Sequence, residues 1–273
     1  MTDVEIFSIG DELLRGLVMD TNSHWMAKRV AARGAALRRV VVLPDDPPTV
    51  AAELRAALDR APGLILTQGG LGPTDDDRTR EAVALATGRE AVRDPRAERI
   101  VRERYAALAA GGHVADAAMT PARLRMADLP RGAVALDNRI GGAPGVLLET
   151  GGAAIVCLPG VPQELWWIWE HSLAEHLDRI LGPGGFCEIT VVLSERDESR
   201  IAEAMHRIAM RHPRVYVKSR ASAFDQPDAR VRATLTASAP SDEAARSLAQ
   251  QALGELREAL DALQVRIERQ DPA

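Results

Sequence analysis

The sequence predicts an α/β protein with a mostly parallel sheet covered by helices on both faces, followed by a second, smaller α+β domain. Over roughly the first 180 residues, short apolar runs alternate with segments of helical period, as in strand–helix units of a parallel sheet. The chain has 273 residues, about twice the length of a common domain. After a glycine-rich stretch at 182–185, the order of elements changes.

In the first domain, apolar runs that end at glycine, proline or polar residues predict buried strands. The first run is closed by Gly10, and Gly34 and Gly88 supply ends for two helices. The expected strands are 4–9, 40–43, 63–67, 146–148 and 154–158. The expected helices are 20–33, 50–58, 77–87, 95–109 and 163–181, with a short helical segment after Pro121.

The second domain is predicted from a different order of elements. A strand at 188–193 and a helix at 198–210 precede two strands with antiparallel alternation, and Ser241 caps a last helix that runs to about residue 263. Gly182-Pro183-Gly184-Gly185 is the best candidate for a linker. The predicted domains are therefore 1–182 and 186–273.

Composition excludes several classes of protein. Hydrophobic residues make up 46% of the chain, enough for a core, and the net charge of -5 lacks the basic excess of nucleic-acid binders. No signal peptide or run of 18 apolar residues is evident, so no membrane association is expected. Cys157 and Cys187 lie in apolar runs and fit buried thiols in a reducing, cytoplasmic compartment.

Three polar or glycine-rich loops follow expected strands, at 10–16, 44–48 and 68–77. Ligands of open α/β sheets bind at the carboxyl ends of the strands, so these loops are expected to meet at one cleft. In the third loop, glycine amides that precede a helix can form an anion-binding nest, although a tight turn without a ligand is about equally plausible for the glycines alone.

Aspartates accompany two of these loops. Asp75, Asp76 and Asp77 follow the glycines, and Asp45 and Asp46 follow another strand. Carboxylates beside a phosphate loop suit a divalent ion such as Mg²⁺, which also binds substrate phosphates, and paired carboxylates can position water for attack at phosphorus. One aspartate of the triplet is expected to cap the helix and at least one to be functional, whereas the Pro-Asp turn alone is more often structural.

Five motifs in order resemble the CinA-like proteins and, more broadly, the MoaB/Mog-like molybdopterin-binding domain. They are IGDELL (9–14), DTNS (20–23), TQGGLGPTDDD (67–77), GGAPG (141–145) and LPGVP (158–162). The resemblance covers about residues 3–180 and implies a doubly wound fold. Residues 186–273, with ERDES (195–199) before a helix, look like the small KH-type domain that follows in CinA-like proteins, and no counterpart of their C-terminal deamidase domain is expected.

The resemblance implies metal-dependent hydrolysis of the pyrophosphate in ADP-ribose or a related nucleotide. A molybdopterin adenylyltransferase and a non-catalytic nucleotide- or pterin-binding protein are the alternatives. By motif position, Asp45 and Asp77 are the implied catalytic residues, and Asp45, Asp76 and Asp77 the implied metal ligands. The residues expected to bind the nucleotide or its phosphates are Gly10, Asp11, Glu12, Asn22, Gly69, Gly70, Gly72, Thr74, Asn138, Gly141, Pro159 and Gly160.

Four positions depart from the pattern of CinA-like sequences, namely Gln68, Gly142, Arg123 and Leu124. These departures bear on substrate specificity. A homo-oligomer, with a dimer favoured, is expected because the relatives assemble and because a helix carries Trp166, Trp167 and Trp169. Nucleic acid is not an expected partner, because the second domain has no evident Gly-x-x-Gly clamp.

Overall fold

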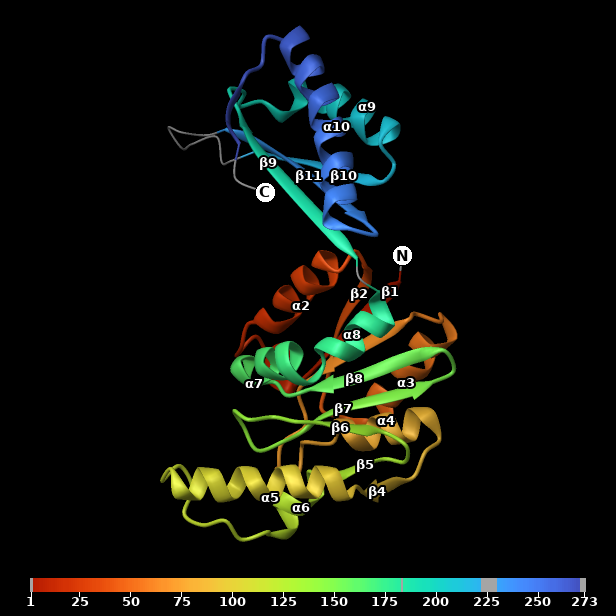
Figure 1. Cartoon of the computed structure of the whole chain (residues 1–273), viewed down its shortest axis with the longest axis vertical. Helices are drawn as coiled ribbons and strands as arrows, with labels where there is room; N and C mark the ends of the chain where they lie inside the picture. Colours follow the sequence, from red (N-terminus) through yellow and green to blue (C-terminus); the bar gives the residue numbers. More distant parts are fainter. Residues whose placement is uncertain (1, 183, 222–229, 271–273) are drawn as a thin grey trace. The chain divides into compact units, whose positions relative to one another are not determined.

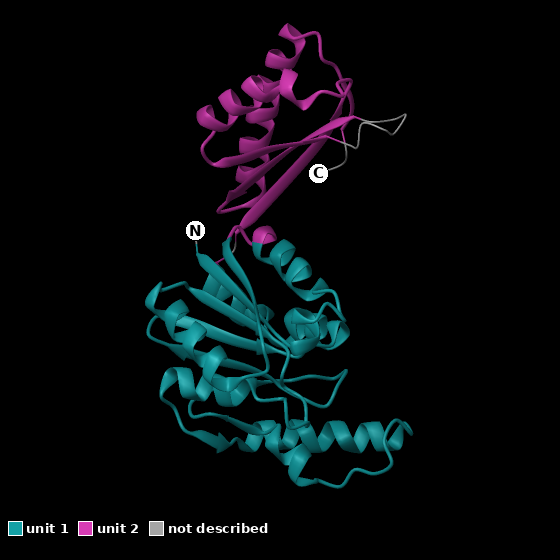
Figure 2. Ribbon diagram, turned by 180° about the vertical axis from the view of Figure 1, so that it is seen from behind, with its two compact units in different colours: residues 1–30, 36–181 teal, residues 31–35, 182–273 magenta. Residues whose placement is uncertain are grey.

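The computed structural model describes residues 2–182, 184–221 and 230–270 (Figure 1). The chain divides into two compact units, one of residues 1–30 and 36–181 and one of residues 31–35 and 182–273 (Figure 2). The division at residue 182 falls in the predicted linker, of which Pro183 lies outside the described residues, whereas the assignment of residues 31–35 to the second unit was not predicted. In the part of the chain that the structure describes, no helix has the length and apolar character that crossing a membrane requires.

The first unit contains a six-stranded sheet with the order β2-β1-β3-β8-β7-β6. Its strands are β1 (Asp3–Ile9), β2 (Ala36–Leu43), β3 (Leu64–Gln68), β6 (Val134–Leu136), β7 (Gly145–Thr150) and β8 (Ala153–Leu158). Strands β2, β1, β3 and β8 run parallel to one another, and β7 pairs antiparallel with both β8 and β6. The predicted mostly parallel sheet is confirmed, and the carboxyl ends of four neighbouring strands meet at one edge.

Helices lie on both sides of this sheet, with α2 and α8 on one side and α3 and α4 on the other (Figure 1). The helices are α1 (Asp11–Leu14), α2 (Thr21–Ala32), α3 (Pro47–Asp59), α4 (Thr79–Thr87), α5 (Pro95–Ala110), α6 (Pro121–Arg125), α7 (Pro162–Trp167) and α8 (Ala174–Leu181). A small two-stranded sheet is formed by β4 (Ala91–Arg93) and β5 (Asp128–Pro130). Phe7, Ile65 and Ile155 pack in one core with α3, α4 and α5, as alternation along the strands requires.

Two predicted helices differ from the structure. The helix expected at 77–87 begins at Thr79, and its N-cap residue is Arg78, so none of the three aspartates caps it. The helix expected at 163–181 is interrupted by a π-helical segment (Ile168–Ser172) between α7 and α8. Aromatic contacts surround this break: Trp25 on α2 lies 5.9 Å from the Trp166 ring centroid and 5.6 Å from that of Trp169.

The second unit is a four-stranded antiparallel sheet with the order β10-β11-β9-β12. Its elements are β9 (Gly185–Leu193), a 3₁₀ turn (Glu198–Arg200), α9 (Ala202–Arg211), β10 (Val215–Ala221), β11 (Val231–Ala239), α10 (Asp242–Ala262) and β12 (Ile267–Gln270). Side chains alternate between buried and exposed along β9 and β11, and the buried ones pack with α9 and α10. This is the smaller α+β unit that the sequence predicts, whereas its KH-type character stays a prediction.

Candidate functional site

The carboxyl ends of the four parallel strands open into a single cleft of about 530 Å³ in the first unit. Gly10 follows β1, Asp45 follows β2, Gly69 follows β3 and Pro159 follows β8, and all four residues line the cleft. The three loops that the sequence places at strand ends are therefore together, as the topology of a parallel sheet demands.

Most of the predicted site residues line this cleft, and four do not. The lining residues among them are Gly10, Glu12, Asn22, Asp45, Gly69, Gly70, Gly72, Asp76, Asp77, Pro159 and Gly160. Asp11, Thr74, Asn138 and Gly141 do not line it, but each contacts a residue that does, namely Asp45, Asp77 or Glu164.

The glycine loop, residues 69–73, has a backbone that requires glycine. Gly69 has a φ of +96°, and a Cβ atom there would lie 2.1 Å from the carbonyl oxygen of Ile9. Thr79 at the start of α4 ties the loop to the helix, because its hydroxyl donates to the Gly69 carbonyl over 2.8 Å and its amide donates to the Gly70 carbonyl over 3.1 Å. The loop is thus held against both β1 and α4.

A buried arginine lies directly behind the glycine loop. Arg80 donates from Nη1 to the Leu71 carbonyl over 2.5 Å and from Nη2 to the Gly72 carbonyl over 3.3 Å. Burial lowers the pKa of Arg80 to about 10, so the guanidinium stays charged at neutral pH. Among the described residues it forms no salt bridge, and the charges of Asp77 and Asp128 act on it from a greater distance.

Two acidic loops are cross-linked beside the glycine loop. The Asp11 amide donates to the Asp45 carboxylate over 2.9 Å, and the Asp45 amide donates to the Asp11 carboxylate over 3.4 Å. The neighbouring Asp46 instead caps α3 by accepting from the Thr49 amide and hydroxyl. The pair predicted from sequence therefore divides its roles, with Asp45 at the cleft and Asp46 at the helix end.

The electrostatics of the acidic wall centre on Asp45. Burial raises the pKa of Asp45, and the negative charges of Glu12, Asp11 and Asp76 raise it further, while the hydrogen bond from the Asp11 amide opposes them. On the other side of the loop, Thr74 donates from its amide and its hydroxyl to the Asp77 carboxylate. The same threonine lowers the pKa of Asp76.

The donor set suits a divalent cation that shares its coordination with a ligand. Mutual repulsion of these carboxylates would be relieved by a hard cation, and carboxylate oxygens are the groups that Mg²⁺ binds. Across the described ranges, however, no three His, Cys, Asp or Glu side chains are grouped to hold a metal by themselves. One or two carboxylates with substrate phosphates would complete such a site.

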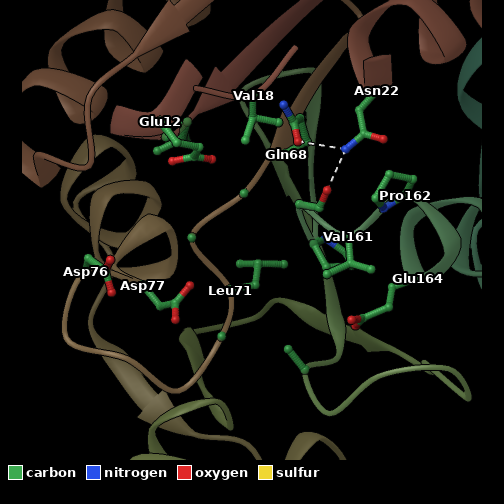
Figure 3. Close-up of a pocket in the computed structure, with 18 of the residues that line it drawn as sticks. Glu12, Val18, Asn22, Gln68, Leu71, Asp76, Asp77, Val161, Pro162 and Glu164 are labelled. Atoms are coloured by element: carbon green, nitrogen blue, oxygen red, sulfur yellow. Dashed lines mark hydrogen bonds between the residues drawn. The ribbon is translucent and has the colours of Figure 1, made fainter. Parts of the chain in front are cut away.

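A buried polar network around Asn22, the member of it that the sequence predicts as a site residue, forms another wall of the cleft (Figure 3). The Asn22 amide donates to Gln68 Oε1 over 3.0 Å and to the Gly160 carbonyl over 2.8 Å. Beside it, the Asp20 carboxylate accepts from the Ser8 hydroxyl over 2.6 Å and from the Ser23 amide over 2.9 Å. In the sequence, Asp20 stands out only as part of the DTNS motif, and Gln68 only as a departure from a family pattern.

A second missed residue is Glu164 in the first turn of α7. Its carboxylate lines the cleft and accepts from the Asn138 amide over 2.7 Å. Burial raises the pKa of Glu164, although the hydrogen bond from Asn138 and the charge of Arg104 act in the opposite direction. A polar residue shortly after a Pro-Gly-x-Pro turn was the signal in the sequence that could have indicated it.

Two of the remaining departures, Gly142 and Arg123, lie around one aromatic ring. Tyr105 lines the cleft, and a Cβ atom on Gly142 would lie 3.1 Å from its ring. The Arg123 guanidinium stacks over the same ring at 3.9 Å from the centroid. Gly142 and Arg123 therefore act together on the position of Tyr105.

At the outer rim of the cleft, Val18 and Val161 are 53% and 49% exposed and give the cleft an apolar edge.

Glu164 leads to a prediction about stability. A raised pKa means that the folded state binds the proton more tightly than the unfolded state, so stability falls as pH rises through the range between the two values. Glu164→Gln is therefore expected to raise the melting temperature at pH 7.5 and to give a smaller gain at pH 4.5. Calorimetry at both pH values checks this, and an equal difference at both would contradict it.

Residues 5–179 match the model of the family described as the probable molybdopterin binding domain. The chain belongs to this family. The match includes the whole cleft and ends within α8, before residues 182–273 of the second unit.

Relatives and solved structures extend this result. A protein of Pyrobaculum aerophilum is 40% identical over 253 residues, which cover 93% of this chain and 92% of that protein. A protein of Aeropyrum pernix is 36% identical over 266 residues, 97% of this chain and 96% of that protein. The crystal structure of the protein CinA from Thermoplasma acidophilum, described as having unknown function, is 29% identical with a TM-score of 0.58 and covers 64% of this chain and 98% of its own.

Proposed function

We propose that the cleft binds a nucleoside diphosphate derivative, ADP-ribose or a related nucleotide. The protein then hydrolyses the pyrophosphate of this substrate with the help of a divalent metal ion. The observation that carries the proposal is the meeting of the glycine loop with Asp45, Asp76 and Asp77 in one cleft. Amides beside a helix N-terminus favour phosphate, and carboxylates favour the cation that phosphate brings with it.

The residues of the cleft have separate roles in this proposal. The glycine loop holds a phosphate, and the positive charge of Arg80 behind it favours the anion. Asp45 and Asp77 orient the attacking water and accept its proton, so that a bond forms from water oxygen to phosphorus while the bridging phosphorus–oxygen bond breaks. When bound by Asp45 with Asp76 or Asp77, Mg²⁺ would neutralise charge on the phosphates.

The rest of the cleft supports a nucleotide in preference to a free phosphate. The apolar rim at Val18 and Val161 and the ring of Tyr105 offer surfaces for a flat heterocycle. A pterin could bind to the same surfaces, and the description of the family supports a pterin ligand at least as well as a nucleotide. An adenylyltransferase for molybdopterin and a protein that binds without turnover are therefore the other outcomes of the test.

The test is release of AMP from ADP-ribose by the purified protein with Mg²⁺, Mn²⁺ or Co²⁺, followed by chromatography. We expect AMP and ribose 5-phosphate from the wild type and at least a hundredfold slower release from Asp77→Asn, because that change removes a charge from the reacting centre. Glu188→Gln, in the second unit, is the control. Absence of AMP with every metal would overturn the assignment, and calorimetry with nucleotides would then identify a binding protein.

A further inference from the structure

The cleft has a second polar wall that the proposed hydrolysis does not use. Glu164 lies on α7, and its carboxylate points into the cleft from the side opposite Leu71 and Asp77 (Figure 3). This wall comes from the chain that follows β8, whereas the glycine loop follows β3. A ligand with its phosphate on the loop would therefore extend toward Glu164.

The carboxylate of Glu164 is held in place by Asn138 and Gly141. Asn138 is fully buried and donates to Glu164 Oε2 and to the Ala143 carbonyl, while its own oxygen accepts from the Ile140 and Gly141 amides. Gly141 packs against the carboxyl group so closely that a Cβ atom there would lie 1.9 Å from Glu164 Cδ. Both predicted site residues, Asn138 and Gly141, thus act by positioning Glu164.

The same carboxylate has no cationic partner of its own. Arg104 is the basic residue whose charge acts on it, but this guanidinium donates to the carbonyls of Gly141 and Ile140. Within the described part of the chain, Glu164 forms no salt bridge, and its Oε1 atom accepts no hydrogen bond. A half-buried carboxylate with a free acceptor facing a cleft is costly unless a ligand completes its hydrogen bonds.

The chemistry of this position selects the group that it binds. A phosphate would be repelled by the carboxylate, so the anion belongs at the glycine loop and a hydrogen-bond donor belongs at Glu164. Adjacent hydroxyls of a ribose are such donors, and a carboxylate that accepts from them is a common means of recognising ribose. We propose that Glu164 is a specificity-determining residue that accepts hydrogen bonds from the ribose hydroxyls of the bound nucleotide. This inference rests on the proposed nucleotide cleft.

The experiment compares binding of AMP, 2′-deoxy-AMP, 3′-deoxy-AMP and inorganic pyrophosphate by calorimetry in the presence of Mg²⁺. We expect Glu164→Gln to weaken AMP binding by about tenfold or more, since hydrogen bonds to a charged acceptor are among the stronger ones. At least one deoxy compound should bind the wild type as weakly as AMP binds the variant and should be insensitive to the substitution. Pyrophosphate affinity should be unchanged, and Glu175→Gln, on exposed α8, should behave as the wild type.

Three results would overturn the inference. If AMP and both deoxy compounds bind the wild type equally, Glu164 does not read ribose, although the nucleotide cleft stands. If Glu164→Gln weakens pyrophosphate as much as AMP, the residue acts on the phosphate site. If neither AMP nor pyrophosphate binds the wild type, the nucleotide cleft and its ribose subsite fail together. Melting temperatures of the variants establish that each one is folded.

Discussion

Replacing Gly69 by alanine is expected to lower the melting temperature of the first unit by about 5–10 °C and to abolish pyrophosphate binding. The φ of +96° strains any side chain, and the new Cβ atom would lie 2.1 Å from the Ile9 carbonyl oxygen. That oxygen belongs to the backbone of a central strand, so relief requires β1 and β3 to separate. Strain and overpacking together cost roughly 2–4 kcal/mol, which corresponds to this change in melting temperature for a unit of this size.

Gly88→Ala is the matched control for this prediction. Gly88 also has a positive φ, +64°, at the end of α4, but a Cβ atom there would meet nothing within 4 Å. It should therefore show backbone strain alone, about 1 kcal/mol, with pyrophosphate binding intact. Equal effects of the two substitutions in calorimetry would show that the close approach of the glycine loop to β1 is not what demands glycine.

The location of the cleft was predictable because the rule behind it is topological. Parallel strands expose their carboxyl ends at one edge, so polar loops after residues 9, 43 and 68 had to meet once the strands were recognised. Apolar runs and glycine stops are local signals, and they identified these strands. The cleft's glycine loop followed from its position after a strand, whereas Asp45 was singled out only by its motif position in the resemblance to the MoaB/Mog-like domain.

Asn22 was predicted as a site residue, but the partners that complete its polar wall depend on contacts between distant parts of the chain. Asn22 bonds Gln68 and Gly160, which are 46 and 138 positions away, and no local spacing encodes such a pairing. The start of α4 was misplaced for a related reason. Thr79 bonds the carbonyls of Gly69 and Gly70, and this tertiary contact overrides the preference of aspartate for a helix cap.

The charges around the glycine loop form a consistent arrangement. On one side of the loop, burial and then the repulsion of neighbouring carboxylates raise the pKa of Asp45, while behind the loop a guanidinium is buried without an ion pair among the described residues. Burial lowers the pKa of Arg80 to about 10, which corresponds to roughly 3 kcal/mol in favour of its uncharged form. A ligand that carries both phosphate and a divalent cation would stabilise the carboxylates around Asp45 and the guanidinium of Arg80. The energetic cost of burying these charges therefore fits a role in ligand binding.

Arg80→Met is expected to weaken pyrophosphate binding by at least tenfold while changing the stability of the unit by little. The substitution leaves the Leu71 and Gly72 carbonyls without their donor, which costs about 1–3 kcal/mol for each buried group, but it also removes the cost of a desolvated charge. These terms offset each other in the free energy of unfolding. Anion binding has no such compensation. The substitution removes a positive charge near the anion and the hydrogen bonds that hold the glycine loop in place.

Arg60→Met is the control for Arg80→Met, because it should lower the stability of the unit and leave pyrophosphate affinity unchanged. Arg60 pairs through two nitrogens with Glu5, whose side chain is 4% exposed, at distances of 2.7 and 2.6 Å. Its removal leaves a buried carboxylate unpaired and should cost roughly 3 kcal/mol, with pyrophosphate binding unchanged because neither residue lines the cleft. Chemical denaturation and calorimetry on both variants measure the two quantities separately. If Arg80→Met lost stability as Arg60→Met does and still bound pyrophosphate, Arg80 would be a structural residue and the positive charge behind the loop would have no part in anion binding.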